Sequence, residues 1–146
     1  MILITGSTGY IGSHISLYFE KNNIDFVGID NLSYSSENNV KKKQKHYFFD
    51  ISNEKKLIEI FRKHNPKTII HCAANSYVLE AETNKKKYFL NNVIKTKKFI
   101  DICKKKKLII LFLCPHLMYI VRRKKHQFFL NTTKLIQKII MEKIKL

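Results

Sequence analysis

The 146-residue chain fits a single domain, and its 45% hydrophobic and 12% aromatic content excludes a disordered polar segment. The net charge is +17 and lies mostly in the second half: residues 1–75 carry ten basic and seven acidic side chains, and residues 76–146 carry eighteen and four. Only three of the 28 basic residues are Arg, the side chain whose planar fork best matches phosphate, so no nucleic-acid partner is expected. A non-enzymatic basic binding module remains the alternative from a different functional class.

The cysteine count and the apolar runs bear on the compartment. Cys72, Cys103 and Cys114 are odd in number and lack metal-ligand spacing, which favours a reduced, cytoplasmic chain without a metal site. The apolar start runs straight into a glycine turn, so no secretory leader is expected. The run 108–121 is shorter than the about 20 residues of a membrane span, so we expect a buried strand and no membrane partner. The basic flanks of this run leave surface membrane contact as a minor alternative.

Apolar runs and stretches of helical period alternate along the chain. Strands are expected at 2–5, 25–30, 46–49, 68–72 and 108–113. Helices are expected at 10–21, around 57–61, at 85–104 and from Thr132 onward; Ser52 is the expected cap of the second, and Asn65-Pro66 its end. The apolar side of the 85–104 helix is expected to comprise Phe89, Val93, Phe99, Ile100 and Cys103. This alternation predicts an α/β fold: a Rossmann-like doubly wound parallel sheet with helices on both faces, incomplete at its C-terminal end.

A glycine turn joins the first expected strand to the first expected helix, with the sequence TGSTGYIG over residues 5–12. Gly6 allows a tight turn, Gly9 lets a pyrophosphate approach the backbone, and Gly12 lets the helix pack closely on the strand. The helix N-terminus then presents free N–H groups and a positive dipole to phosphates. The spacing therefore predicts a dinucleotide site.

Three further strand ends support a dinucleotide site. Asp30 ends the second strand eighteen residues after Gly12, where a carboxylate accepts the ribose hydroxyls of NAD and repels the extra phosphate of NADP. Asp50 and Ile51 follow the third strand and are candidates to hold the adenine edge. After the fourth strand, the small residues of His71-Cys72-Ala73-Ala74 leave room for a ligand, and His71 itself is expected to be a packed histidine. NAD is the predicted cofactor.

These motifs, together with Tyr88 and Asn91-Asn92-Val93, resemble the N-terminal half of the UDP-glucose 4-epimerase family, which belongs to the NAD-dependent epimerase/dehydratases of the extended short-chain dehydrogenase/reductase family. The resemblance covers roughly residues 1–110. It implies epimerisation at C4 of a nucleotide sugar through transient hydride transfer to NAD. The sibling nucleotide-sugar epimerases and dehydratases remain alternatives.

The resemblance also implies a contact for each matching residue. Pyrophosphate contacts fall on Gly6, Gly9, Tyr10, Ile11 and Gly12; adenosine-ribose contacts on Asp30, Asn31 and Ser35; adenine contacts on Asp50 and Ile51; nicotinamide-side contacts on Cys72, Ala73 and Ala74; and a helix contact near the cofactor on Asn92. Ser76 falls where some relatives carry a cofactor-contacting Lys. The resemblance further suggests a homodimer through helices like 85–104.

The expected catalytic motifs are not intact. The family carries a Ser cluster after the fifth strand, whereas this chain has Pro115 at the place of the catalytic Ser, although Tyr119 aligns with a Tyr of that stretch. Lys134 is a possible remnant of the Tyr-x-x-x-Lys motif, but Leu130 then stands at the Tyr position, and no other Tyr-x-x-x-Lys occurs. A reading-frame slip around residues 111–131 is a hypothesis that explains this change.

We therefore divide the chain into an NAD-binding domain over residues 1–112, an irregular segment over 113–131 and a C-terminal helix over 132–146, without a substrate domain. A UDP-sugar would bind only if missing sequence completed the chain. The expected activity is that of a cofactor half-site without turnover of its own; the alternative is an epimerase completed by another chain. An unpaired edge of the incomplete sheet predicts marginal stability.

Overall fold

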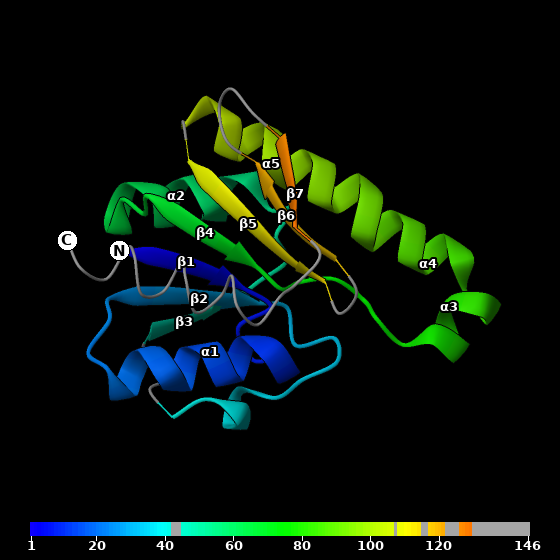
Figure 1. The fold of residues 1–146 in the computed structure, drawn as a ribbon, viewed down its shortest axis with the longest axis horizontal. Coiled ribbons are helices and arrows are strands. Elements are labelled where there is room, and N and C mark those ends of the chain that lie inside the picture. The colour runs from blue at the N-terminus through cyan, green and yellow to red at the C-terminus, as the bar shows by residue number, and fades with distance from the viewer. Residues whose placement is uncertain (42–44, 107, 115–116, 122–125, 130–146) are drawn as a thin grey trace.

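The computed structural model describes residues 1–41, 45–106, 108–114, 117–121 and 126–129 (Figure 1). In this part of the chain seven strands form one sheet in the order β3-β2-β1-β4-β5-β6-β7. The neighbours from β3 to β5 pair in parallel, whereas β6 and β7 pair antiparallel. The strands are β1 (Ile2–Thr5), β2 (Phe26–Asp30), β3 (His46–Phe48), β4 (Thr68–His71), β5 (Ile109–Cys114), β6 (Leu117–Val121) and β7 (His126–Phe129).

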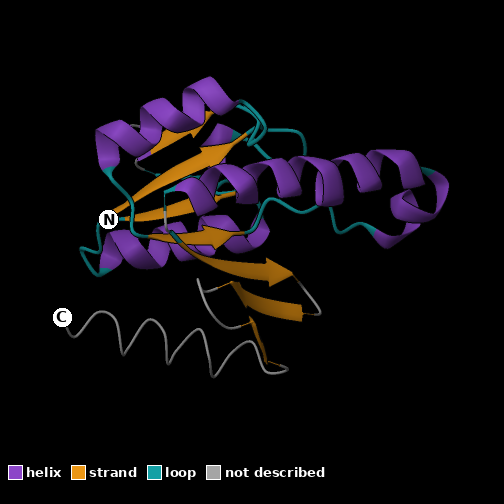
Figure 2. Cartoon of the chain, turned by 90° about the horizontal axis from the view of Figure 1, so that it is seen from above, coloured by secondary structure: helices purple, strands orange, loops and turns teal. Residues whose placement is uncertain are grey.

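Helices cover both faces of the parallel strands, so the predicted α/β architecture is confirmed. They are α1 (Tyr10–Lys21), the 3-10 turn η1 (Glu37–Asn39), α2 (Glu54–His64), α3 (Val78–Thr83), α4 (Lys85–Phe89), the π-helical segment η3 (Leu90–Lys95) and α5 (Thr96–Lys105). Helix α1 lies on one face, whereas α2 and the continuous α4–η3–α5 helix lie on the other (Figure 2). No helix within the described ranges is long and apolar enough to cross a membrane.

Alternation along the strands divides the core between the two faces. Leu3, Val27, Ile29 and Ile69 pack with residues of α2 and α5, including the fully buried Leu57, Phe99 and Cys103. Ile4, Phe26 and Ile70 point the other way and pack with Phe19 of α1. A parallel strand buried on both faces reads as a continuous apolar run, because successive side chains alternate between two dry surfaces.

The long helix departs from its predicted apolar side. Phe99 and Cys103 are fully buried as expected, but Phe89 and Val93 are 58% and 45% exposed. The N-terminal part of this helix extends past the edge of the parallel strands, so it has no sheet beneath it (Figure 2). The π segment also inserts an extra residue into one turn, which shifts the faces before it relative to those after it.

Two further expectations require correction. Asn53 caps α2, accepting from the Lys56 backbone N–H at 3.2 Å, whereas Ser52 bonds Asp50 instead. The helix does end before Asn65, which adopts the left-handed conformation with φ 44°. The segment 113–131, for which no regular structure was predicted, contributes β6 and β7. The expected helix over 132–146 lies outside the described residues.

Candidate cofactor-binding site

A cleft of about 530 Å³ opens where the parallel strands end, at the edge where ligands of open α/β sheets bind. Nine of the predicted cofactor residues line it: Gly6, Gly9, Asp30, Asn31, Ser35, Ile51, Cys72, Ala73 and Ala74. An adjoining cleft shares the glycine turn and adds Tyr10, Ile11 and Gly12. Asp50 and Asn92 line neither cleft, but each bonds a residue that lines the first one, Asn31 and Asn75 respectively.

The glycine turn brings two backbones into contact. Gly6 has φ +68°, and a Cβ there would lie 2.6 Å from the Cys72 carbonyl carbon and 2.8 Å from the Ala73 nitrogen, so no side chain fits. At Gly9 a Cβ would meet only the Gly6 carbonyl oxygen, at 3.3 Å, and would otherwise stand in the cleft. Gly12 differs from its expected role: a Cβ there would overlap the Gly6 carbonyl, so Gly12 packs against the turn rather than against the strand.

The N-terminus of α1 opens onto the same clefts without a side-chain cap. Gly9 is the N-cap residue, and no acidic side chain lies in the first helical turn. The first intrahelical bond runs from the Ser13 N–H to the Gly9 carbonyl, at 2.8 Å. The N–H groups of the first turn therefore have no acceptor within the helix and form a site suited to an anion.

Asp30 is 93% buried at the end of β2 and lies against the turn. One carboxylate oxygen accepts from the Thr8 N–H at 3.1 Å; the other accepts from the Leu32 N–H at 2.8 Å and the Ser35 hydroxyl at 3.2 Å. A carboxylate offers about four acceptor positions, so capacity remains for a ribose hydroxyl. Ser35, expected at the ribose, lies beside this carboxylate and also bonds Thr8 Oγ1 at 2.6 Å.

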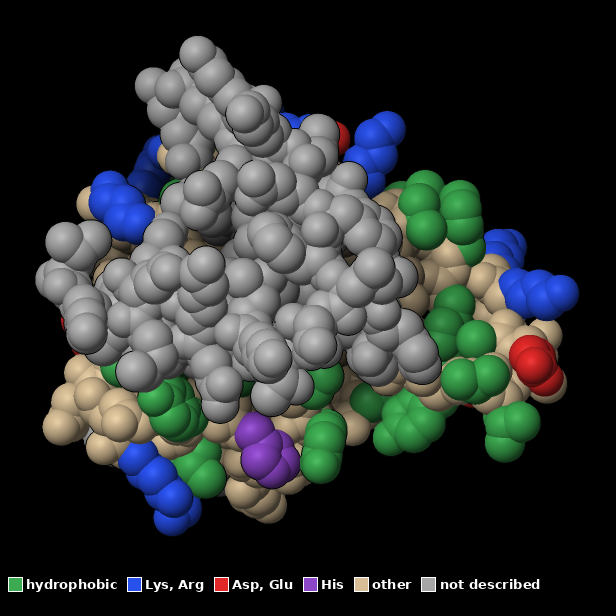
Figure 3. Space-filling view, in the orientation of Figure 1, with side chains coloured by type: hydrophobic (Ala, Val, Ile, Leu, Met, Phe, Trp, Pro, Cys, Tyr) green, Lys and Arg blue, Asp and Glu red, His purple; other side chains and the backbone are tan. Residues whose placement is uncertain are grey.

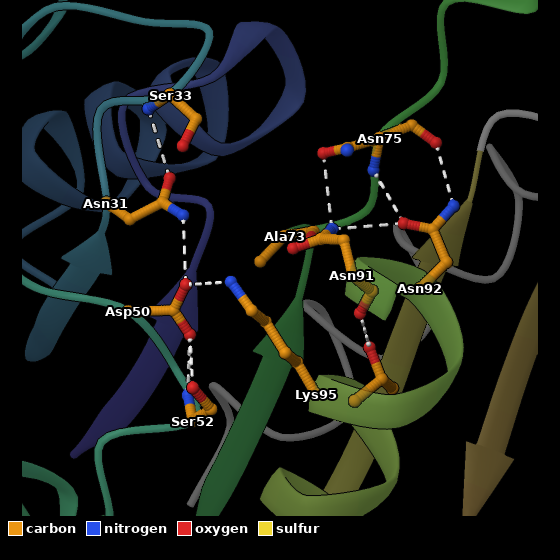
Figure 4. Close-up of polar contacts among 10 residues, drawn as sticks. Asn31, Ser33, Asp50, Ser52, Ala73, Asn75, Asn91, Asn92 and Lys95 are labelled. Carbon is orange, nitrogen blue, oxygen red and sulfur yellow. Dashed lines mark hydrogen bonds and ion pairs between the residues drawn. The ribbon is translucent and has the colours of Figure 1, made fainter. Parts of the chain in front are cut away.

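Asp50 forms a polar bridge across the strand ends (Figure 4). Lys95 Nζ donates to Oδ2 at 2.5 Å, Asn31 Nδ2 donates to the same oxygen at 3.3 Å, and Ser52 donates twice to Oδ1. Burial by itself raises the pKa of Asp50, but the bonds from Lys95 and Ser52 outweigh it and lower the pKa to about 2. The predicted adenine contact would therefore share its carboxylate with a lysine that the sequence analysis did not identify.

The helix asparagines hold the loop after β4 (Figure 4). Asn92 accepts from the Asn75 N–H at 2.9 Å through its side-chain oxygen and donates to the Asn75 carbonyl at 2.9 Å. Asn91 donates to the Ala73 carbonyl at 3.1 Å and lines the cleft. Both residues belong to η3, and its wider turn lets two successive side chains reach one loop. The structure thus assigns the cleft-lining position to Asn91 and a supporting position to Asn92.

Cys72 lines the cleft, and His71 precedes it as the last residue of β4. Thr5 Oγ1 is 2.6 Å from His71 Nδ1, Thr96 Oγ1 is 3.4 Å from Nε2, and the ring stacks on Phe99. Burial lowers the pKa of His71 to about 4, so it is a neutral packed histidine at neutral pH. Burial, with a smaller effect of the Asp30 charge, raises the pKa of the Cys72 thiol to about 12, so this thiol is not an activated nucleophile.

Three residues that line the cleft were not predicted from the sequence, and most residues of the expected catalytic motifs lie outside the described residues. Tyr34, Asn75 and Asn91 line the cleft; of these, only Asn91 had a sequence signal, as the neighbour of Asn92. Tyr119 falls in β6, opposite Phe112 of β5. Pro115, Leu130 and Lys134 lie outside the described residues.

The chain resembles known proteins over most of its described length. The model of the NAD dependent epimerase/dehydratase family matches residues 2–119. The bifunctional protein GAL10 of Candida maltosa is 38% identical over 112 residues, covering 71% of this chain and 73% of that protein. The UDP-glucose 4-epimerase of Dictyostelium discoideum is 36% identical over 111 residues, covering 71% of this chain and 32% of its own length.

Solved structures show the same fold. The UDP-glucose 4-epimerase of Brucella ovis, in complex with NAD, is 31% identical with a TM-score of 0.70, over 76% of this chain and 34% of that one. The Thermotoga maritima enzyme, with UDP-glucose, is 27% identical with a TM-score of 0.70, over 76% and 36%. This chain thus spans about a third of the length of these epimerases. The chain belongs to the NAD dependent epimerase/dehydratase family.

Proposed function

We propose that this chain binds NAD at the carboxyl edge of its sheet, as the cofactor half of a UDP-glucose 4-epimerase-like enzyme. The observation that carries the proposal is the junction of the turn and Asp30: an uncapped helix N-terminus opens beside a carboxylate held by the Thr8 N–H. Gly9, at the helix N-terminus, and Asp30 line the same cleft.

The residues fit a dinucleotide on two grounds. The missing Cβ at Gly9 leaves open the space next to the helix N-terminus, where a diphosphate would accept from backbone N–H groups. The Asp30 carboxylate would accept from a ribose hydroxyl, and its charge would repel a 2′-phosphate. Bound NAD would supply a hydride acceptor for the sugar carbon.

Calorimetric titration with NAD and NADP tests the proposal. NAD should bind, and NADP should bind at least ten-fold more weakly, because a phosphate near a buried carboxylate raises the electrostatic free energy of the complex. Asp30→Asn, which keeps the shape of the side chain, should reduce the ratio of NAD affinity to NADP affinity. Equal affinity for both cofactors would remove the role given to Asp30, and no binding of either would refute the proposal.

Turnover by this chain alone is not expected. The 146 residues contain no Tyr-x-x-x-Lys motif, and a missing general base typically costs 10²–10⁴-fold in rate. Epimerase activity of the isolated chain would contradict this statement. A nucleotide sugar other than UDP-glucose remains open, since dTDP-D-glucose 4,6-dehydratase of Dictyostelium discoideum is 34% identical over 115 residues.

We further propose a cytoplasmic homodimer. Apolar side chains gather over α3 and α4, at the right-hand end of Figure 3. Val78, Leu79 and Phe89 are 64%, 82% and 58% exposed there, and Val93 and Ile94 extend the patch along η3. Single exposed apolar residues are normal on a surface, so the support for an interface here is that several of them lie on the neighbouring helices α3 and α4 and on η3.

A further inference from the structure

Ser7, the residue after Gly6, is fully buried although it belongs to the ligand-binding turn. Its N–H donates to the Ile29 carbonyl of β2 at 3.2 Å. Its hydroxyl lies 2.9 Å from Nδ1 of His46, the first residue of β3. The turn is thus tied by a side chain to a strand two positions away in the sheet.

Gly28 makes this contact possible. It pairs with His46 in the register of β2 and β3, so the two residues lie side by side. A Cβ at Gly28 would lie 2.5 Å from Ser7 Oγ and would overlap the His46 ring. The ring therefore reaches the turn only by crossing the surface that a glycine leaves bare. Ser7, Gly28 and His46 form one interdependent unit.

One nitrogen of the His46 ring, Nε2, is buried without a hydrogen-bond partner among the residues that the structure describes. His46 is 6% exposed and packs edge-on against Phe26. A buried ring with one bonded and one unpaired nitrogen gains little stability over an aromatic ring without nitrogens, because the unpaired atom loses its hydration. The distinctive effect of the imidazole is therefore its hydrogen bond to the Ser7 hydroxyl.

We propose that His46 is a positioning residue for the dinucleotide turn, holding Ser7 through the gap that Gly28 leaves so that the turn keeps its ligand-binding geometry. The inference rests on the proposed binding of NAD and adds a determinant of its affinity. Ser7 connects Gly6 to Thr8, whose N–H bonds Asp30. A release of Ser7 would loosen both the glycine turn and the placement of the ribose-binding carboxylate.

The test compares Ser7→Ala, His46→Phe and the double variant with the intact chain. Each single variant leaves one buried polar atom without its partner, whereas the double variant removes both partners together. We expect all three to bind NAD roughly three- to ten-fold more weakly, the loss of one hydrogen bond. The double variant should regain the urea midpoint of the intact chain but not its affinity. The losses in affinity should not add, because the two residues act through one contact.

Tyr47→Phe is the matched control. It removes the hydrogen bond of the neighbouring β3 residue to His64, 2.8 Å long, on the face away from the turn. Its NAD affinity should equal that of the intact chain.

Amide hydrogen exchange provides a readout that needs no cofactor. The N–H groups of Ser7 and Thr8 should exchange several-fold faster in His46→Phe and in the double variant, but not in Tyr47→Phe. Unchanged exchange, or an affinity that recovers with stability in the double variant, would overturn the role of His46. If the intact chain binds no NAD, the proposed function fails, and the exchange rates still decide whether His46 positions the turn.

Discussion

Acidification should unfold this protein through two buried histidines. Burial lowers the pKa of both His46 and His71 from 6.5 to about 4. Between pH 4 and 6.5 the unfolded chain binds a proton on each ring and the folded chain does not. The free energy of unfolding therefore has its full value above pH 6.5 and falls as the pH drops toward 4. Each ring accounts for roughly 1.4 kcal/mol per pH unit, or about 3 kcal/mol over the whole interval. The two together approach the about 5–15 kcal/mol of a typical domain.

Urea unfolding at half-unit intervals from pH 7.5 to 4.5 measures this effect. His46→Phe should reduce the slope of unfolding free energy against pH by about 1.4 kcal/mol per unit near pH 5. His14→Gln is the control, since this ring lies on the surface of α1. His64, whose pKa burial also lowers, is present in every protein compared and cancels in the difference. Asp50, whose pKa is lowered to about 2, is likewise present in every protein compared and cancels in the difference.

An unchanged pH slope in His46→Phe would refute the burial of this ring as a cause of acid unfolding. That result would mean that the ring is protonated in the folded state or hydrated in a way that the structure does not show. A slope reduced equally by His14→Gln would also count against burial as the cause.

Three other predictions concern the turn, the ion pair and the exposed patch. Gly6→Ala should destabilise the chain by about 3 kcal/mol in urea unfolding. The left-handed backbone costs about 1–2 kcal/mol for a residue with a side chain, and the Cβ would also strike the backbone after β4. Gly9→Ala should fold normally but bind NAD weakly, and equal stability of the two variants would contradict this distinction. Lys95→Met should raise the pKa of Asp50 in a carbon-13 NMR titration and lower stability by at most about 1 kcal/mol, because both side chains of the pair are partly exposed. An unmoved pKa would show that Ser52 alone holds the charge. The intact chain should sediment as the proposed homodimer and Leu79→Lys as a monomer; a monomeric intact chain would refute the dimer, and a dimeric variant would refute this patch as its interface.

Local backbone chemistry explains why the sequence located much of the site. Gly6 is required by a positive φ and by contact with the next strand end, and both demands appear in the sequence as a glycine after an apolar run. Asp30 and the small residues 72–74 stand at strand ends, where a parallel sheet brings its ligand groups together. These features depend on one segment at a time, so their order along the chain is enough to identify them.

Contacts between segments far apart in the chain could not be predicted from the sequence patterns. The π segment changed which face of the long helix meets the sheet, so that Asn91 rather than Asn92 lines the cleft. Lys95 reaches Asp50 across forty-five positions, and no local pattern marks either as the other's partner. The antiparallel strands β6 and β7 also form without a clear hydrophobic period, because strand pairing depends on a neighbour's register.

The amino-acid sequence by itself determined the alternating α/β fold, the glycine turn and the acidic strand end, since each follows from backbone geometry and hydrophobic period within a few residues. Only the tertiary structure decided how these parts support one another: Ser7 bonded to His46 over Gly28, and Asp50 held by Lys95. Such pairings depend on which side chains the packed sheet brings within about 3 Å, a distance that separation along the chain does not encode.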